Sequence, residues 1–132
     1  MPHHQRHILA FNDSTEVLSV LKELLEEEGY RVTTHARLIS DLAEIRELAP
    51  DLMILDYMWA DEDAGWAALQ LLRLDPEIGK VPLILCTGAK REVTEIASHL
   101  TAMGVQVVLK PFDIDTLLEA VAAALPPLSA AT

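Results

Sequence analysis

The sequence predicts an α/β fold in which helices cover both faces of a parallel, doubly wound sheet. Short apolar runs alternate five times with segments whose apolar residues recur at helical spacing, which is the pattern of βαβ units around a parallel sheet. The run at 52–55 has no polar alternation and therefore indicates a strand buried on both faces. A chain of 132 residues can bury roughly two-thirds of its unfolded surface, which is enough for one core.

Five strands are predicted from the apolar runs. They cover residues 8–11, 31–35, 52–55, 81–86 and 105–109. Five helices are predicted between and after them. They cover residues 15–25, 38–49, 66–74, 93–103 and 117–125. Ser14 or Thr15 can cap the first helix and Gly29 can end it, and glycine or proline follows each of the other four. No linker or internal repeat divides the chain, so one domain over residues 6–125 with a short tail at 126–132 is expected.

The composition disfavours several classes of partner. Twenty-one acidic against ten basic residues give a net charge of −11, which repels phosphates and disfavours direct binding to nucleic acid or to an anionic membrane. No apolar stretch approaches the roughly 18 residues of a membrane helix, and no signal-peptide pattern is present, so a cytoplasmic protein without membrane insertion is expected. The single Cys86 excludes an internal disulfide, and its place in a predicted buried strand indicates packing rather than reactivity.

Chemically useful residues follow three of the predicted strands. The run 52–55 stops at a carboxylate, Asp56, the first strand leads into Asn12 and Asp13, and the fifth leads into Lys110. The carboxyl ends of parallel strands meet at one edge of a sheet, and this edge is where open α/β sheets build their sites. We therefore expect these side chains to share one place.

The strand ends also carry a family resemblance. Four motifs resemble, in order and near the family spacing, those of the receiver domain of two-component response regulators: Asn12-Asp13, Asp56, Thr87 and Lys110-Pro111-Phe112. The resemblance spans residues 6–125. It implies a flavodoxin-like sheet of strand order 2-1-3-4-5 with five helices, and a phosphoacceptor signalling domain rather than an enzyme. No output domain is attached, so a single-domain receiver of the chemotaxis-regulator kind is expected.

The resemblance implies a role for each residue around the central carboxylate. Asp56 would accept a phosphoryl group from a sensor histidine kinase or a phosphotransfer protein, as a carboxylate nucleophile that forms an acyl phosphate. Mg²⁺ would be held by Asp13, Asp56 and the backbone carbonyl of Met58, because this cation prefers oxygen ligands. Asn12 stands where the family usually has an acid, so its contribution is expected to be weak and to pass through a metal-bound water.

Three further residues would bind the phosphoryl group and report it. Lys110 would reach the phosphoryl oxygens as a point charge, and Pro111 resembles the family's cis-proline, which aims that lysine. Thr87 would donate its hydroxyl to a phosphoryl oxygen. The signal is expected to pass through the helix at 93–103, the fifth strand and the last helix to an unidentified downstream protein, or to a second copy in a homodimer.

Departures from the family pattern keep a second interpretation open. Val107 replaces the usual aromatic residue of the fifth strand, and Ala60 replaces the usual proline in the loop after the third. Together with Asn12, they support a degenerate receiver whose surface binds a partner without phosphorylation. Met58 and Trp59 are apolar where water must approach, which predicts slow hydrolysis of a phosphorylated form.

Each site residue has a structural interpretation as well. Asp56 can be a solvated strand end, Asn12 and Asp13 can be a helix-capping pair, and Thr87 can be a turn residue before Gly88.

Two other functions are disfavoured by single positions. Aspartate-based phosphohydrolases resemble a pattern with a second acid two residues after the first, and here that position is Met58. Dinucleotide binding is disfavoured because residues 11–14 contain no glycine where a pyrophosphate would approach a helix.

Overall fold

The computed structural model describes residues 5–12, 14–36, 42–57, 70–87, 102, 104–109 and 114–125, and only the backbone at positions 56, 57, 87, 107, 109 and 114. The strands are β1 (His7–Phe11), β2 (Arg31–His35), β3 (Leu52–Tyr57), β4 (Leu83–Thr87) and β5 (Val105–Leu109). The helices are α1 (Thr15–Glu27), α2 (Leu42–Leu48), the 3-10 helix η1 (Ile78–Lys80) and α5 (Ile114–Ala124). Residues 70–74 are also helical.

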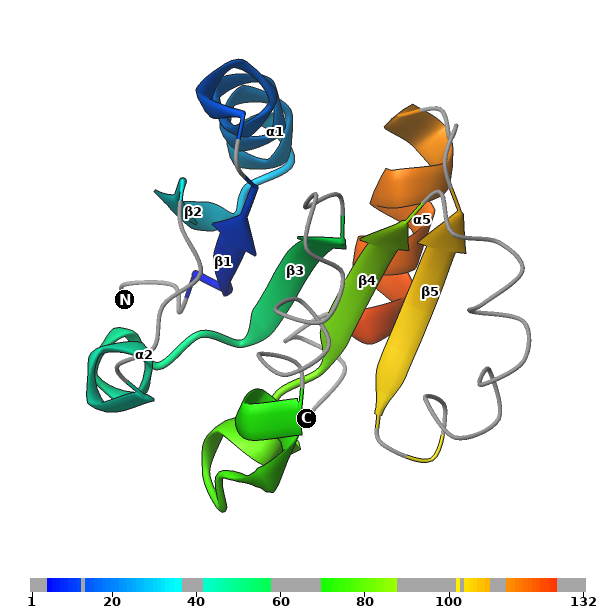
Figure 1. Cartoon of the computed structure of the whole chain (residues 1–132). Coiled ribbons are helices and arrows are strands. Elements are labelled where there is room, and N and C mark those ends of the chain that lie inside the picture. The colour runs from blue at the N-terminus through cyan, green and yellow to red at the C-terminus, as the bar shows by residue number, and fades with distance from the viewer. Residues whose placement is uncertain are drawn as a thin grey trace, which may run out of the picture.

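The five strands form one parallel sheet (Figure 1). Their order is β2-β1-β3-β4-β5, and every neighbouring pair is parallel. The predicted doubly wound sheet and its strand order are therefore confirmed. All five residues of β1 are buried, as are residues 52–55 of β3, as expected for apolar strands at the centre of a sheet covered on both faces.

Alternate residues of each strand supply two apolar layers. One core cluster joins α1 and α5 to the sheet through residues such as Ile54, Leu25 and Val121. The second cluster joins α2 and the segment at 70–80 to the opposite face, through residues such as Leu55 and Ile45. The period of two along each strand thus separates the layers, and the helices cover both faces, as predicted.

Helix α1 begins where its sequence predicts and ends at Glu27, two residues after the predicted end at 25. The Ser14 hydroxyl oxygen accepts the Val17 N–H at 3.2 Å, which satisfies one of the unpaired donors at the helix start. The helix is followed by Gly29 at φ 95°, a left-handed conformation that glycine adopts without a steric penalty. Ser14, rather than Thr15, is the cap.

Three predicted strands differ from the structure by one or two residues at their ends. β1 begins at His7 rather than at residue 8. β3 continues through Asp56 and Tyr57 instead of ending at 55, and β4 covers 83–87 instead of 81–86. Tyr57 pairs with Thr87, so pairing extends both strands beyond their apolar runs. Val81 is not part of β4, because its N–H donates to the Ile78 carbonyl within the preceding turn. The predicted helix at 93–103 lies outside the described residues except for residue 102, and so does the start of the helix at 66–74.

The turn between residue 74 and β4 is more ordered than its sequence predicts. The buried Asp75 accepts the backbone N–H groups of Glu77 and Ile78, each at 2.9 Å. Its other carboxylate oxygen accepts two N–H groups of Arg46, at 3.1 and 2.7 Å. Arg46 lies on α2, so one carboxylate connects η1 to that helix. Hydrogen bonds from Arg46 and the backbone lower the pKa of Asp75 to about 2.

Polar groups also join the elements at the amino edge of the sheet. The His7 ring is buried, with Nδ1 2.9 Å from the Leu48 carbonyl oxygen of α2 and Nε2 2.7 Å from the Thr33 hydroxyl of β2. The His7 backbone N–H donates to the Asp51 carboxylate at 2.8 Å. His7 is thus a structural residue that connects β1 to α2 and β2.

Candidate functional site

The carboxyl ends of the strands form the edge of the sheet where the sequence predicts a site (Figure 1). Asp56 on β3 pairs with Cys86 on β4, and Tyr57 pairs with Thr87. Thr87 in turn pairs with Leu109, the last residue of β5. The backbone positions of Asp56 and Thr87 therefore lie at one edge, together with the end of the strand that precedes Lys110.

Asn12 occupies the matching position on the other side of β3. Phe11 of β1 pairs with Leu55 of β3, so Asn12, the next residue, stands level with Asp56. The residues two positions before each of them belong to the core cluster beneath α1 and α5. Because a strand alternates between its two faces, positions 12 and 56 belong to this same face of the sheet, and position 87 belongs to the other.

The Asn12 side chain is buried, with 4% of its surface exposed, and its partners are specific. Its backbone N–H donates to the His35 carbonyl at 3.2 Å, which continues the contact between β1 and β2 by one residue. Its side-chain oxygen Oδ1 accepts the Ser14 N–H at 2.8 Å. Asn12 therefore helps to start α1, which is the structural interpretation that the sequence left open for it.

The surface beneath this edge is apolar and closely packed. Cys86 is 4% exposed and belongs to the core cluster of α1 and α5, so its predicted packing role is confirmed. On the opposite face the Phe11 and His35 rings stack, with centroids 6.0 Å apart. The sequence did not predict this pair. Close packing of this kind holds the strand ends at a fixed spacing.

Four of the predicted site residues, Asp13, Met58, Lys110 and Pro111, lie outside the described residues. Within the described part of the chain, no group of three or more His, Cys, Asp or Glu side chains could hold a metal ion. The donor types that the sequence supplies after these strands are nevertheless suited to Mg²⁺. A carboxylate at 56, a second carboxylate at 13 and a backbone carbonyl at 58 are all oxygen ligands, which this cation prefers.

Comparison with known families identifies the family and supports the fold. Residues 8–122 match the family described as the response regulator receiver domain. The chain belongs to this family. Receiver domains are the phosphoacceptor signalling domains of two-component response regulators and are not classical enzymes, so the predicted family and fold are confirmed.

Curated relatives of this receiver domain are transcriptional regulators. The phosphate regulon transcriptional regulatory protein PhoB of Rhizobium meliloti is 38% identical over 120 residues, which cover 89% of this chain and 51% of PhoB. The transcriptional regulatory protein PdtaR of Mycobacterium tuberculosis is 31% identical over 119 residues, with coverage of 88% and 55%. The chain thus spans about half the length of the curated relatives it matches. The expected single-domain organisation stays a prediction.

Solved structures share the whole receiver architecture. Chemotaxis response regulator CheY4 of Vibrio cholerae superposes with a TM-score of 0.75 at 24% identity, over 92% of this chain and all of that one, which shows the fold alone. Response regulator TrrA of Thermotoga maritima has a TM-score of 0.70 at 28% identity, over 92% of this chain and 100% of that chain. That structure is a complex with Mg²⁺ and BeF.

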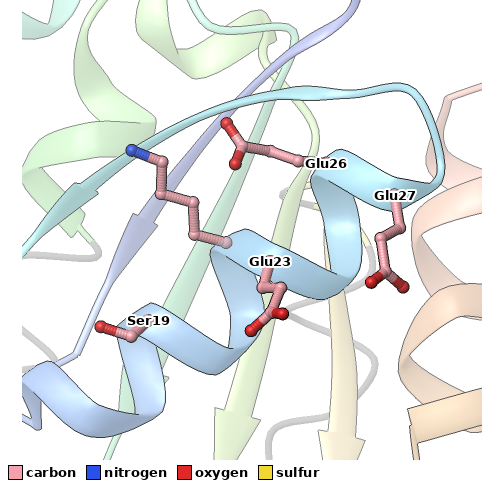
Figure 2. Close-up of a pocket in the computed structure, with 5 residues that line it drawn as sticks. Ser19, Glu23, Glu26 and Glu27 are labelled. Carbon is pink, nitrogen blue, oxygen red and sulfur yellow. The ribbon is translucent and has the colours of Figure 1, made fainter.

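A depression on the surface of α1 is lined mainly by charged side chains. It is open, has a volume of about 470 Å³ and is lined by Ser19, Lys22, Glu23, Glu26 and Glu27. Figure 2 labels four of these residues, Ser19, Glu23, Glu26 and Glu27, along the helix. These side chains all belong to exposed positions of one helix surface. Exposed charges on one helix face are typical of a solvated surface.

The part of the receiver domain that the structure describes includes no helix that is both long and apolar enough to cross a membrane.

Proposed function

We propose that this receiver domain accepts a phosphoryl group on Asp56 from a histidine kinase or a phosphotransfer protein and then binds a protein partner with altered affinity. The observation that supports it best is the register of the sheet. Asp56 is at the carboxyl end of the central strand β3, level with Asn12, which follows β1, and adjacent to the end of β4, which carries Thr87. A phosphoryl donor can reach a nucleophile in this position from the solvent side, while residues on both sides of the nucleophile bind the phosphoryl oxygens.

The proposed reaction is a direct transfer between two side chains. An oxygen of the Asp56 carboxylate attacks the phosphorus of a phosphohistidine, the new P–O bond forms, and the P–N bond breaks with its electrons leaving on the imidazole nitrogen. When bound, Mg²⁺ supplies positive charge that neutralises the phosphoryl oxygens. Asp13, Asp56 and the Met58 carbonyl would hold it, and Lys110 would add a second positive charge.

Thr87 is proposed as the residue that reports phosphorylation. The alternation of β4 assigns it to the face of the sheet opposite position 56, so a movement toward the phosphoryl group would alter that face. Its partner in the register is Leu109, at the end of β5. The proposed output surface includes β5 and α5, where Gln106 and Glu119 are exposed and polar.

Phosphorylation of one carboxylate is directly measurable. We would incubate the protein with acetyl phosphate and millimolar Mg²⁺ and follow its intact mass. The wild type should gain the mass of one phosphoryl group, and Asp56→Ala should gain none. Asp115→Ala is the matched control, because Asp115 is an exposed aspartate on α5 and its loss should leave the gain unchanged. A wild type that folds but gains no mass contradicts the proposal.

The degenerate receiver is the second candidate, and the capping contact of Asn12 favours it. An acid at this position would add negative charge to the metal site, whereas Asn12 is neutral and its Oδ1 accepts the Ser14 N–H. A folded wild type that neither gains mass nor responds to beryllofluoride would favour a surface that binds its partner without phosphorylation.

Single-domain action is part of the proposal, and a much longer polypeptide detected by antibody in source cells would contradict it.

A further inference from the structure

Two leucines project into solvent near the end of the helical segment at 70–74. Leu74 is 79% exposed and Leu71 is 51% exposed, and they lie three positions apart, on one side of the helix. Among the described residues, the other exposed large apolar side chains are Val17 and Val20 on α1. Isolated exposed apolar residues are common, whereas an apolar patch rimmed by polar groups marks a contact surface, so the surroundings of each pair decide its meaning.

An open hollow of about 230 Å³ lies between α2 and η1, beside the two leucines. Leu74 is adjacent to it through the next residue, because the Asp75 carboxylate bonds Arg46 and the Ile78 N–H, which both belong to its lining. An apolar cavity of about 150 Å³ holds a benzene ring, so this hollow can hold the end of a leucine side chain. Its apolar lining consists of Ile45, Ala49, Pro50, Ile78 and Val81.

The charges around the hollow balance. The segments 45–50 and 73–81 contain every residue that lines it, and they carry three basic and three acidic side chains. Helix α1, beside the two exposed valines, carries four acidic side chains and one basic one. Two copies of a chain with net charge −11 repel each other, and they repel least where the local charge is zero. A contact between two copies is therefore favoured at the hollow over α1.

We propose that the surface formed by Leu71, Leu74 and the hollow binds a second copy of the chain in a two-fold symmetric dimer, with Leu74 of each copy in the hollow of the other. A two-fold interface joins the same surface on both copies, so that surface must complement itself. Here one surface carries both the projecting side chain and the hollow that receives it. Two residues of opposite charge, Arg46 and Glu77, also lie on the lining of the hollow.

This dimer surface is separate from the other proposed sites. Pro50 and Val81 of the hollow precede β3 and β4, so the hollow lies at the amino ends of these strands, whereas Asp56 lies at the carboxyl end of β3. The cluster beneath α2 and η1 is on the face of the sheet opposite the cluster beneath α5. A dimer of this kind leaves both the phosphoacceptor edge and α5 accessible.

Sedimentation equilibrium of the whole chain tests the association. The wild type should form a reversible dimer with a Kd between about 10 µM and 1 mM, because the patch is small. This Kd should fall as salt is added, since salt screens the repulsion between the two acidic copies. Leu74→Ser should raise the Kd by about a hundredfold, because each dimer loses two buried leucine side chains.

Val20→Ser is the matched control, since Val20 is also an exposed apolar residue but lies on α1, and it should leave the Kd unchanged. Leu74 is too exposed for its replacement to disturb the core. A wild type that stays monomeric at about 1 mM overturns the inference and leaves the hollow to a side chain of a different protein. A dimer that Leu74→Ser does not weaken, or that both variants weaken equally, also overturns it.

Backbone amide spectra of the wild type at increasing dilution locate the contact without any variant. The resonances of Ala49, Leu74, Glu77 and Val81 should shift with concentration, and those of α1 and α5 should not. Shifts centred on α1 or α5 would assign the dimer to another surface and overturn the inference. Both measurements use the unphosphorylated chain, so a dimer in a protein that gains no phosphoryl group contradicts the proposed function alone.

Discussion

At the residue scale, the local sequence and the three-dimensional partners favour different roles for the same side chain. Asn12 is interpreted from sequence as a weakened member of a metal site, and the structure adds a contact to Ser14 that any short polar side chain could make. Sequence allows both roles because capping and metal binding use the same oxygen chemistry. The structure shows that the Asn12 side-chain oxygen accepts the Ser14 N–H, and the register sets the backbone of position 12 level with that of position 56.

Ala49 provides a prediction at this scale. It follows α2 at φ 48°, where a side chain with a Cβ is strained, and its N–H donates to the Ile45 and Arg46 carbonyls, as at the end of many helices. Ala49→Gly should raise the free energy of unfolding by about 0.5–1 kcal/mol, since glycine tolerates this conformation and Ala49 is exposed.

Chemical denaturation checks this value against a variant of opposite sign. Ala122 is an exposed residue inside α5, where Ala122→Gly should lower the free energy of unfolding by about 1 kcal/mol. Two glycine variants that change stability in the same direction would show that the conformation of Ala49 is not strained.

At the element scale, most of the fold could be predicted because each strand and helix carries its own local pattern. The runs 31–35 and 105–109 coincide with β2 and β5, and the Ser14 cap and Gly29 stop enclose α1. The turn at Asp75 could not be predicted in the same way. Its carboxylate is held by Arg46, 29 residues earlier, and no local pattern encodes a contact over that separation. Asp75-Pro76 indicates from sequence only that a helix ends.

The link between α2 and η1 predicts a dependence of stability on pH. The pKa of Asp75 is lowered from 3.8 to about 2 in the folded protein, so its carboxylate stabilises the fold fully above pH 3.8. That contribution is lost as the pH falls from 3.8 toward 2. Asp75→Asn removes the charge, so the wild type should have the higher melting temperature at neutral pH, and the difference should narrow on acidification.

Thermal unfolding of both proteins between neutral pH and pH 3 would measure this narrowing. Other carboxylates titrate in the same range, but they act equally on both proteins and cancel in the difference. Asp115→Asn is the matched control, because that exposed side chain on α5 should give a small difference at every pH. A wild-type advantage that is unchanged at pH 3 would contradict the role assigned to Asp75.

At the scale of the whole molecule, the dominant electrostatic fact is the net charge of −11. Self-repulsion of this size opposes the compact state and weakens as salt shortens the Debye length to about 10 Å at 0.1 M. Four of the 21 acidic residues lie on α1, which has Glu16 in its first turn and no basic residue in its last. The helix dipole favours a negative charge at its start and disfavours one at its end. At Glu27, the self-repulsion of the whole molecule and the helix dipole both disfavour the negative charge. At Glu16, the self-repulsion disfavours the charge and the helix dipole favours it.

Two charge reversals on this one helix separate the terms. Glu16→Lys and Glu27→Lys change the net charge equally, and both side chains are exposed. At low salt, Glu27→Lys should raise the free energy of unfolding by about 0.3–1 kcal/mol, because it removes an acid from the helix end and creates a Glu23–Lys pair at i, i+4. Glu16→Lys should give a smaller gain or a loss, and the gap between the two should close as salt is added. Equal gains at low salt would show that only the net charge affects the free energy of unfolding. The acidic end of α1 would then carry no local electrostatic cost that a basic partner could relieve.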